Sequence, residues 1–302
     1  MKEKYTKLII DEAFRLGFSA CGISKARFLE EEAKNLENWL KSKKNGEMSF
    51  MERNFDKRLN PCLMVNNAKS VISVSQNYFP KKEIKNISIS KFAYGKDYHI
   101  LMKKKLKKLM DFIKKNIGEV NGRTFVDSAP VLERKWAKLS GIGWVGKNAN
   151  LINFHNGSFF FLGELIIDLE LNYNNEISKN YCGTCRICID ACPTGAIEKE
   201  FVINANKCIS YLTVEFKGKI NENLQAKLNV FACDICQDVC PFNKKSIPHK
   251  EDFFHPKKIL FEKNLEDWKK ISKKEFNEIF RGSAIKRIKY EKFLRNLHFQ
   301  KK

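Results

Sequence analysis

The sequence has no uninterrupted apolar run that approaches the ~18 residues of a membrane-spanning helix. The longest candidate, residues 158–171, contains Glu164 and Asp168. The N-terminus opens with Lys2, Glu3 and Lys4, and no apolar stretch ending in a cleavage site follows. An export signal is therefore not expected, and the sequence predicts a cytoplasmic protein without membrane contact.

Cysteine is too dilute for a disulfide scaffold, with ten cysteines in 302 residues. Acidic residues are also few: Asp and Glu number 35 against 56 Lys and Arg, which leaves a net charge of +21. Such a charge suits a polyanionic partner such as nucleic acid. It equally fits a general compositional bias, because the whole chain is rich in Lys, Asn, Ile and Phe. Hydrophobic residues reach 43%, enough for a packed core and two or three domains.

Helical and strand patterns alternate along the first 170 residues, which predicts an α/β domain with one central sheet. The predicted helices are 1–16, 28–44, 98–116 and 131–140, and the predicted strands are 18–23, 71–78, 123–126 and 158–169. A polar linker follows at 172–175, and eight of the ten cysteines then lie before residue 250. Helices are predicted again at 267–271, 273–280 and 285–297. We therefore expect domains at 1–171, 172–250 and 251–302, the last a short helical tail.

The cysteines form two related motifs. Cys182-x2-Cys185-x2-Cys188-x3-Cys192-Pro193 matches the bacterial ferredoxin run that binds a [4Fe–4S] cluster. Cys208 and then Cys233-x2-Cys236-x3-Cys240-Pro241 make a second set with a distant leading cysteine. Pro193 suits the first turn of a helix, so a helix is predicted over 194–197.

Two-cluster ferredoxins exchange their fourth ligands, which gives a specific ligand assignment. Cluster one then takes Cys182, Cys185, Cys188 and Cys240, and cluster two takes Cys192, Cys208, Cys233 and Cys236. The alternative is a pair of four-cysteine zinc sites, but these normally use two CxxC pairs rather than a triple run closed by Cys-Pro. Cys21 and Cys62 stand alone and are expected to be small buried side chains rather than ligands.

Polar and glycine-rich residues concentrate at 126–134, 141–148 and 158–164. Asp127 follows a predicted strand, where α/β domains place their ligands. Gly141-x-Gly143-x-x-Gly146 looks like a dinucleotide motif, but a predicted helix precedes it instead of a strand, so that interpretation is rejected.

Together with the cysteine pattern, these blocks closely resemble the epoxyqueuosine reductases over about residues 5–299. The further matching blocks are Met51–Arg53, Tyr94–His99, Cys208–Thr213 and Phe280–Arg287. Longer members of that family continue into a helical-repeat domain after the last block. This chain stops at Lys302 and resembles a short form.

The resemblance implies a cobalamin and two [4Fe–4S] clusters, and an N-terminal domain related to reductive dehalogenases. It implies reduction of epoxyqueuosine to queuosine at the wobble position of tRNA, with Asp127 as the proton donor. A half-buried carboxyl could keep its proton near neutral pH; the alternative is that Asp127 caps the following helix. By position in the matching blocks, the resemblance assigns the cobalamin contacts to Arg53, Asp127, Lys147, Asn148, Ser158, Gly163 and Ser210.

The block Asp97–His99 resembles the start of an Asp-x-His-x-x-Gly motif that supplies histidine to cobalt in other cobalamin enzymes. Met102 occupies the glycine position, so His99 is expected to be a packed or substrate-facing residue instead. Ala93 stands where some members of the family have a cysteine. The expected partners are tRNA bearing epoxyqueuosine and an unidentified electron donor, and the chain is expected to be a monomer. The tRNA contacts are expected on the basic surface, including Lys286, Arg287, Lys289, Lys292 and Arg295.

Three other functions remain open from the residues. A corrinoid reductive dehalogenase would share the core but usually carries a twin-arginine export signal. A non-catalytic iron–sulfur protein that binds nucleic acid would not need the residues around Asp127. A plain electron-transfer ferredoxin would leave more than half of the chain unexplained.

Overall fold

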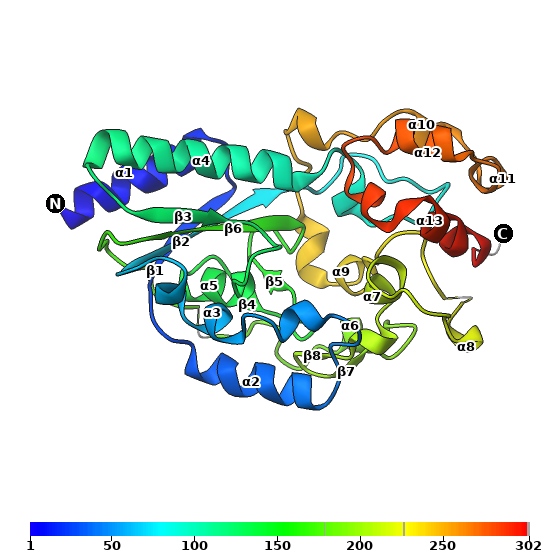
Figure 1. Cartoon of the computed structure of the whole chain (residues 1–302), viewed down its shortest axis with the longest axis horizontal. Helices are drawn as coiled ribbons and strands as arrows, with labels where there is room; N and C mark the ends of the chain where they lie inside the picture. The colour runs from blue at the N-terminus through cyan, green and yellow to red at the C-terminus, as the bar shows by residue number, and fades with distance from the viewer. Residues whose placement is uncertain (178, 226, 301–302) are drawn as a thin grey trace.

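The protein is described by a computed structural model that covers residues 1–177, 179–225 and 227–300. A four-stranded sheet forms the centre of the N-terminal half (Figure 1). Its strands are β1 (Ala20–Lys25), β2 (Ser70–Asn77), β6 (Phe160–Ile167) and β3 (Gly122–Phe125), in that spatial order. The prediction of one central sheet is confirmed, and every neighbouring pair in it is antiparallel.

Helices cover both faces of the sheet. On one face lie α1 (Lys2–Arg15) and α4 (Tyr98–Ile117), which bury their apolar stripes against Ile72, Val74 and Leu165. The opposite face packs on α5 (Glu133–Leu139), with α3 (Phe55–Leu59) and α2 (Glu30–Lys41) beyond it (Figure 1). Because side chains alternate along a strand, neighbouring residues of β6 face different helices.

The cysteine-rich segment is built from short elements. Its strands β7 (Ile197–Lys199) and β8 (Val202–Ile203) form a hairpin, and a second hairpin of β4 (Trp144–Val145) with β5 (Leu151–Ile152) precedes the segment in sequence. Its helices are α6 (Ile187–Asp190), α7 (Ile209–Val214), α8 (Glu222–Gln225) and α9 (Ile235–Asp238). Short 3₁₀ turns occur at Ser49–Met51, Pro61–Leu63, Lys91–Ala93, Ala205–Lys207, Pro241–Lys245, Asp252–Phe254 and Ala284–Ile288.

The helix predicted over 194–197 is wrong. Residues after Pro193 form a turn, and Ile197 already begins β7. Gly195 has a φ of +61°, and the Ala196 N–H donates to the Cys192 sulfur at 3.3 Å. The sulfur takes a backbone donor there, and the left-handed glycine turns the chain away from helical geometry.

The C-terminal tail is helical, with α10 (Ile259–Glu262), α11 (Leu265–Lys269), α12 (Lys273–Ile279) and α13 (Lys289–His298). The single helix predicted over 285–297 is divided, because Lys289 has a φ of +59° between the 3₁₀ turn and α13. Trp268, Phe280 and Phe293 form the centre of the tail's core. This core also contains side chains from residues 84–94, a segment that precedes α4 in sequence.

Among the described residues, no helix is both long and apolar enough to cross a membrane.

Candidate active site

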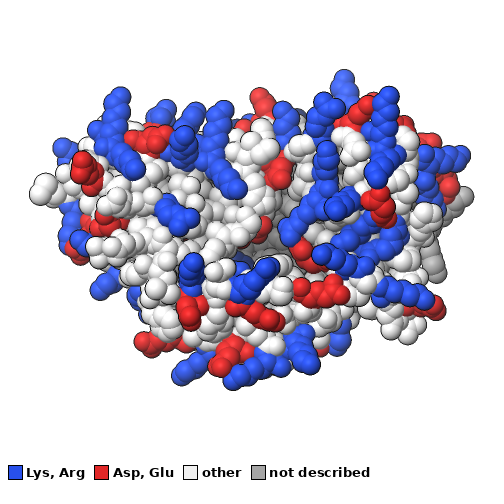
Figure 2. All heavy atoms as spheres, in the orientation of Figure 1, with Lys and Arg blue, Asp and Glu red and all other residues white. Residues whose placement is uncertain are grey.

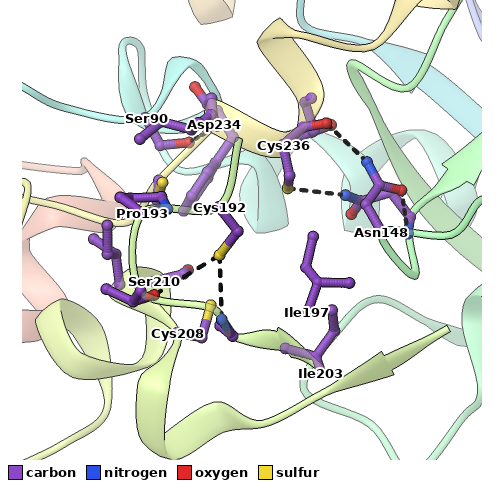
Figure 3. Close-up of a pocket in the computed structure, with 18 of the residues that line it drawn as sticks. Ser90, Asn148, Cys192, Pro193, Ile197, Ile203, Cys208, Ser210, Asp234 and Cys236 are labelled. Atoms are coloured by element: carbon purple, nitrogen blue, oxygen red, sulfur yellow. Dashed lines mark hydrogen bonds between the residues drawn. The ribbon is translucent and has the colours of Figure 1, made fainter. Parts of the chain in front are cut away.

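A cavity of about 370 Å³ lies between the sheet domain and the cysteine-rich segment (Figure 3). Apolar side chains make up much of its wall, from the start of β6 and from the β7–β8 hairpin. The residues that line it include Tyr78, Ser90, Phe92, Tyr98, Arg134, Asn148, Asn150, Phe160, Phe161, Ile197, Ile203 and Ser210. Cys192, Cys208, Cys233 and Cys236 also line it. In Figure 3 the sulfurs of Cys192, Cys208 and Cys236 point into one space.

The cysteine thiols fall into two electrostatic groups. Burial raises the pKa of the Cys188 thiol, and the nearby thiols of Cys182, Cys240 and Cys185 raise it further. Burial also raises the pKa of Cys233 to about 12, with contributions from Asp234, Cys208 and Cys192. The two groups are adjacent, since Cys188 also acts on Cys236.

The two groups differ in their surroundings. Cys182, Cys185 and Cys188 are partly exposed, and Cys240 is buried beside Trp144. The second group borders the cavity, where the Asn148 amide donates to the Cys236 carbonyl at 3.0 Å. Among the described residues, no three Cys, His, Asp or Glu side chains are grouped so that they could hold one metal ion.

Asp127 lies on the loop that joins β3 to α5. Its side chain is 46% exposed, and its Oδ2 lies 3.3 Å from Nε2 of His99. The other ring nitrogen of His99, Nδ1, lies 2.8 Å from Oδ1 of Asp97. Asp97 is also the residue whose side chain caps α4, by accepting the His99 N–H at 3.0 Å. The histidine is therefore held between two carboxylates, which favours its charged form.

The expectation that burial keeps a proton on Asp127 is wrong. Burial does raise the pKa of this carboxyl, but the hydrogen bond and charge of His99 outweigh it and the net pKa is lowered. The contacts with Asp127 and then Asp97 raise the pKa of His99 to about 9. At neutral pH the proton therefore resides on the imidazole. The capping alternative for Asp127 is also wrong, because the N-cap of α5 is Leu132, without a side-chain cap.

Tyr98 connects this pair to the cavity. Its ring stacks on Phe161 with centroids 4.0 Å apart and an interplanar angle of 4°. The same ring stacks on His99 at 4.2 Å. Tyr98 and Phe161 both line the cavity, so the imidazole lies one stacked ring away from its wall.

The predicted cofactor contacts do not all gather at the cavity. Asn148 and Ser210 line it. Lys147 is buried in an ion pair with Glu200 at 2.8 Å, and Arg53 is exposed just after the 3₁₀ turn at Ser49–Met51.

Two further predicted contacts also lie elsewhere. The Ser158 hydroxyl donates to Gln237 at 2.9 Å. Gly163 faces α4, since a Cβ there would lie 2.9 Å from Leu106.

Several residues that line the cavity carry no functional signal in the sequence. Phe160 and Phe161 lie in one of the blocks that resemble the family, but their place in a predicted strand indicates only a role in the core. Ser90 and Phe92 lie in an irregular segment without a recognisable motif. Figure 3 shows Ser90 beside Asp234. The Asp234 carboxylate accepts from the Lys91 N–H at 2.7 Å, which fixes this segment against α9.

Basic residues are spread over the surface (Figure 2), and on α4 they include Lys103, Lys104, Lys107 and Lys108. Two of the tail cations expected to contact tRNA are used inside the fold. Lys292 donates to the Val214 carbonyl at 2.9 Å, and Arg295 donates to the Leu212 carbonyl at 3.0 Å. Arg287 pairs with Glu215 at 2.7 Å. Lys286 and Lys289 are exposed.

Known family models match parts of both the sheet domain and the cysteine-rich segment. Residues 181–243 match the family model described as a 4Fe-4S double cluster binding domain. Residues 58–128 match the family "Epoxyqueuosine reductase QueG, DUF1730". The double-cluster match favours iron–sulfur clusters over the four-cysteine zinc sites.

Curated relatives share most of the chain. The epoxyqueuosine reductase of Cellulophaga algicola is 52% identical over 304 residues, covering 99% of this chain and 99% of the relative. That of Escherichia coli is 39% identical over 292 residues, covering 93% of this chain and 76% of the longer relative.

Solved structures agree in fold. An epoxyqueuosine reductase crystallised with an epoxyqueuosine-modified tRNA-Tyr stem loop superposes with a TM-score of 0.91 at 28% identity, over 98% of this chain and 80% of that one. The Bacillus subtilis enzyme, described with the loop of a catalytic aspartate swung out of the active site, gives a TM-score of 0.89 at 27% identity, over 98% and 80%.

A more distant likeness extends to the catabolic reductive dehalogenase NpRdhA, with a TM-score of 0.52 at 16% identity, over 80% of this chain and 32% of that one. The expected fold is confirmed, an N-terminal domain related to reductive dehalogenases followed by a double-cluster domain and a helical tail. The expected cofactor set, two [4Fe–4S] clusters and a cobalamin, is confirmed at the level of the family and its fold. The chain belongs to the epoxyqueuosine reductases, a family of oxidoreductases.

Proposed function

We propose that this protein reduces epoxyqueuosine to queuosine at the wobble position of a tRNA anticodon, with the His99–Asp127 pair as its proton source. The observation that carries the proposal is this pair, one stacked ring from a cavity that four cysteines border. Removal of the epoxide oxygen balances as epoxide plus two electrons and two protons giving an alkene and water. The site must therefore supply both electrons and protons.

The eight motif cysteines are proposed as the cluster ligands, in the exchanged arrangement. Cys240 acts electrostatically with Cys182, Cys185 and Cys188, although it follows Cys236 in sequence. Cys192, which ends the first motif, acts with Cys208 and Cys233. The partly exposed first group faces the electron donor in this proposal, and the second group faces the cavity.

The mixed lining of the cavity suits a cofactor that combines a flat ring with polar substituents. Phe160, Ile197 and Ile203 supply apolar wall, while Asn148 and Ser210 supply polar groups. We propose that Asn148 and Ser210 hold the cobalamin there, which when bound would supply the electrons for the reduction. The other carried-over contacts, Arg53, Asp127, Lys147, Ser158 and Gly163, stay predictions.

The proton transfer uses residues of this chain. His99 holds a proton on Nε2, 3.3 Å from the Asp127 carboxylate. Asp127 is exposed and can reach a substrate oxygen, so we propose that it receives this proton and delivers it to the departing oxygen. Asp97, bound to the opposite nitrogen of the ring, keeps the imidazole oriented. Solvent supplies the second proton.

The tRNA substrate is supported by the relative crystallised with a modified stem loop. Exposed lysines on α4 and at the C-terminal tail offer non-specific phosphate contacts, whose affinity should fall with salt. A monomeric state, a cytoplasmic location, an unidentified electron donor and the division at residues 171 and 250 stay predictions.

The decisive experiment is anaerobic incubation of the reconstituted protein with epoxyqueuosine-containing tRNA, cobalamin and a reductant, followed by mass analysis of the nucleosides. We expect loss of one oxygen from the modified nucleoside. Unchanged epoxyqueuosine in the presence of intact clusters and bound cobalamin would refute the proposal, as would zinc in place of iron in freshly isolated protein.

A further inference from the structure

Asp127 adopts a backbone conformation that needs support. Its φ is +46°, in the left-handed region that costs a residue with a Cβ about 1 kcal/mol. The regular hydrogen bonds of β3 end at Phe125, so the sheet does not fix this position. The Asp127 side chain contacts His99, so a separate contact must hold its backbone.

Glu133 supplies that contact. It is the first residue of α5, and its Oε1 accepts the Asp127 N–H at 2.6 Å. This is the one hydrogen bond of the Glu133 carboxyl within residues 1–177, 179–225 and 227–300. The bond spans the loop from its strained residue to the helix that follows.

We infer that Glu133 is a positioning residue that latches the Asp127 loop over the site, and that loss of this hydrogen bond lets the loop swing away. The inference rests on the proposed role of Asp127. In the Bacillus subtilis relative a catalytic loop that carries an aspartate is described as swung out of the active site.

A second buried carboxyl, that of Glu164, lies close enough to Glu133 for the two groups to interact electrostatically. Glu164 is 0% exposed and faces α5 from β6, paired in register with Ser73 and Phe125. Neither of its oxygens has a hydrogen-bond partner in the part of the chain that the structure describes. Burial and then the charge of Glu133 raise its pKa well above the ordinary value. Glu164 therefore stays neutral and adds no negative charge that would repel the Glu133 carboxyl.

The charged and titratable groups that face Glu133 are Asp127 on the loop, Arg134 on α5, Tyr98 and His99 on α4 and the neutral Glu164 on β6. Burial, followed by the charge of Asp127, raises the pKa of Glu133 to about 8. The latched arrangement thus binds a proton more tightly than a solvent-exposed glutamate does. A protonated Glu133 still accepts the N–H through its carbonyl oxygen but does not repel Asp127.

Latching is unimpaired below the ordinary glutamate pKa, weakens as pH rises, and reaches its weakest state above about pH 8. Hydrogen–deuterium exchange of the amides in residues 126–132, corrected for intrinsic base catalysis, should therefore become faster as the pH rises toward 8.

The test is hydrogen–deuterium exchange of the full chain with both clusters present and no substrate. Glu133→Ala removes the acceptor and should speed exchange in peptides spanning residues 126–132 at least tenfold, with little change in the remainder of α5. Glu133→Gln keeps a carbonyl acceptor, so it should retain near-native exchange while losing the acceleration toward pH 8.

Glu32→Ala is the matched control. Glu32 pairs with Lys135 on α5 at 2.6 Å but does not touch the Asp127 loop, so its loss should leave exchange at residues 126–132 unchanged. The inference is overturned if Glu133→Ala leaves the loop protected, if Glu32→Ala exposes it equally, or if Glu133→Gln behaves like the alanine variant. Because exchange needs no turnover, failure of the proposed catalysis would leave this result readable by itself.

Discussion

The Nε2 atom of His99, in the first turn of α4, lies 3.3 Å from Oδ2 of Asp127, on the loop after β3. This contact joins two segments that are distant in sequence and places the proton on the histidine at neutral pH. The expected chemistry at Asp127 is therefore that of a pair, in which the carboxylate accepts and passes on a proton.

Asp127→Asn should lower the rate of epoxyqueuosine reduction about 10²–10⁴-fold, the usual contribution of a general acid. The amide is nearly isosteric, so iron content and cobalamin binding should stay at native levels. Nucleoside mass analysis measures the rate, and visible absorption monitors both cofactors. Full activity in this variant would remove Asp127 from the mechanism.

His99→Gln should cost about 10²-fold in rate and change its pH dependence. The native His99 pKa of about 9 lies above the ordinary value of 6.5, so its proton is present below that ordinary value and is lost as pH rises through 9. The reduction rate of the native protein should therefore fall as pH rises through about 9. The variant should not show this alkaline fall in rate. A pH–rate profile under single-turnover conditions distinguishes the two, and an unchanged alkaline limb would assign it to another group.

The exchanged ligand arrangement can be tested with Cys188→Ser, Cys240→Ser and the double variant. If both cysteines serve one cluster, each single variant and the double variant should lose about the same half of the iron. If Cys240 instead belongs with Cys236, the double variant should lose nearly all of it. Iron analysis after anaerobic reconstitution gives the answer. Cys62→Ser is the control outside both motifs, because Cys62 is exposed and the expectation that it is buried is wrong.

Asn296→Ala should destabilise the junction of the tail with the cysteine-rich segment. The fully buried Asn296 amide donates to the carbonyls of Thr213 at 3.0 Å and Val230 at 2.9 Å. Losing both partners should lower the free energy of unfolding by about 2 kcal/mol. Denaturant titration measures the loss.

Glu291→Ala, at an exposed ion pair with Lys273, serves as the control and should change stability by less than about 0.5 kcal/mol. Equal effects of the two substitutions would mean that Asn296 contributes no more than a surface residue.

Local sequence signals predicted many of the elements. The α4 helix begins where Asp97 can cap it and ends at Ile117, just before Gly118, so its predicted bounds of 98–116 differ from the structure by a single residue. The prediction over 194–197 failed because the Cys192 sulfur and Gly195 impose a turn that helix propensity does not register.

The functional groups were harder to assign because their behaviour depends on neighbours. Lys292 and Arg295 look like surface cations in the sequence, yet both donate to backbone carbonyls of the cysteine-rich segment. Asp127 was identified through its motif, but its protonation was inferred with the wrong sign, since His99 was not known to face it.

The sequence alone therefore determined the cysteine spacing, the strand and helix patterns and the family, because each is written in residues that are close together along the chain. Tertiary structure decided which cysteines share a neighbourhood, which side chains border the cavity and which of His99, Asp127 and Glu133 carries a proton. Those properties depend on distances between segments and on burial, and only the packed chain sets them.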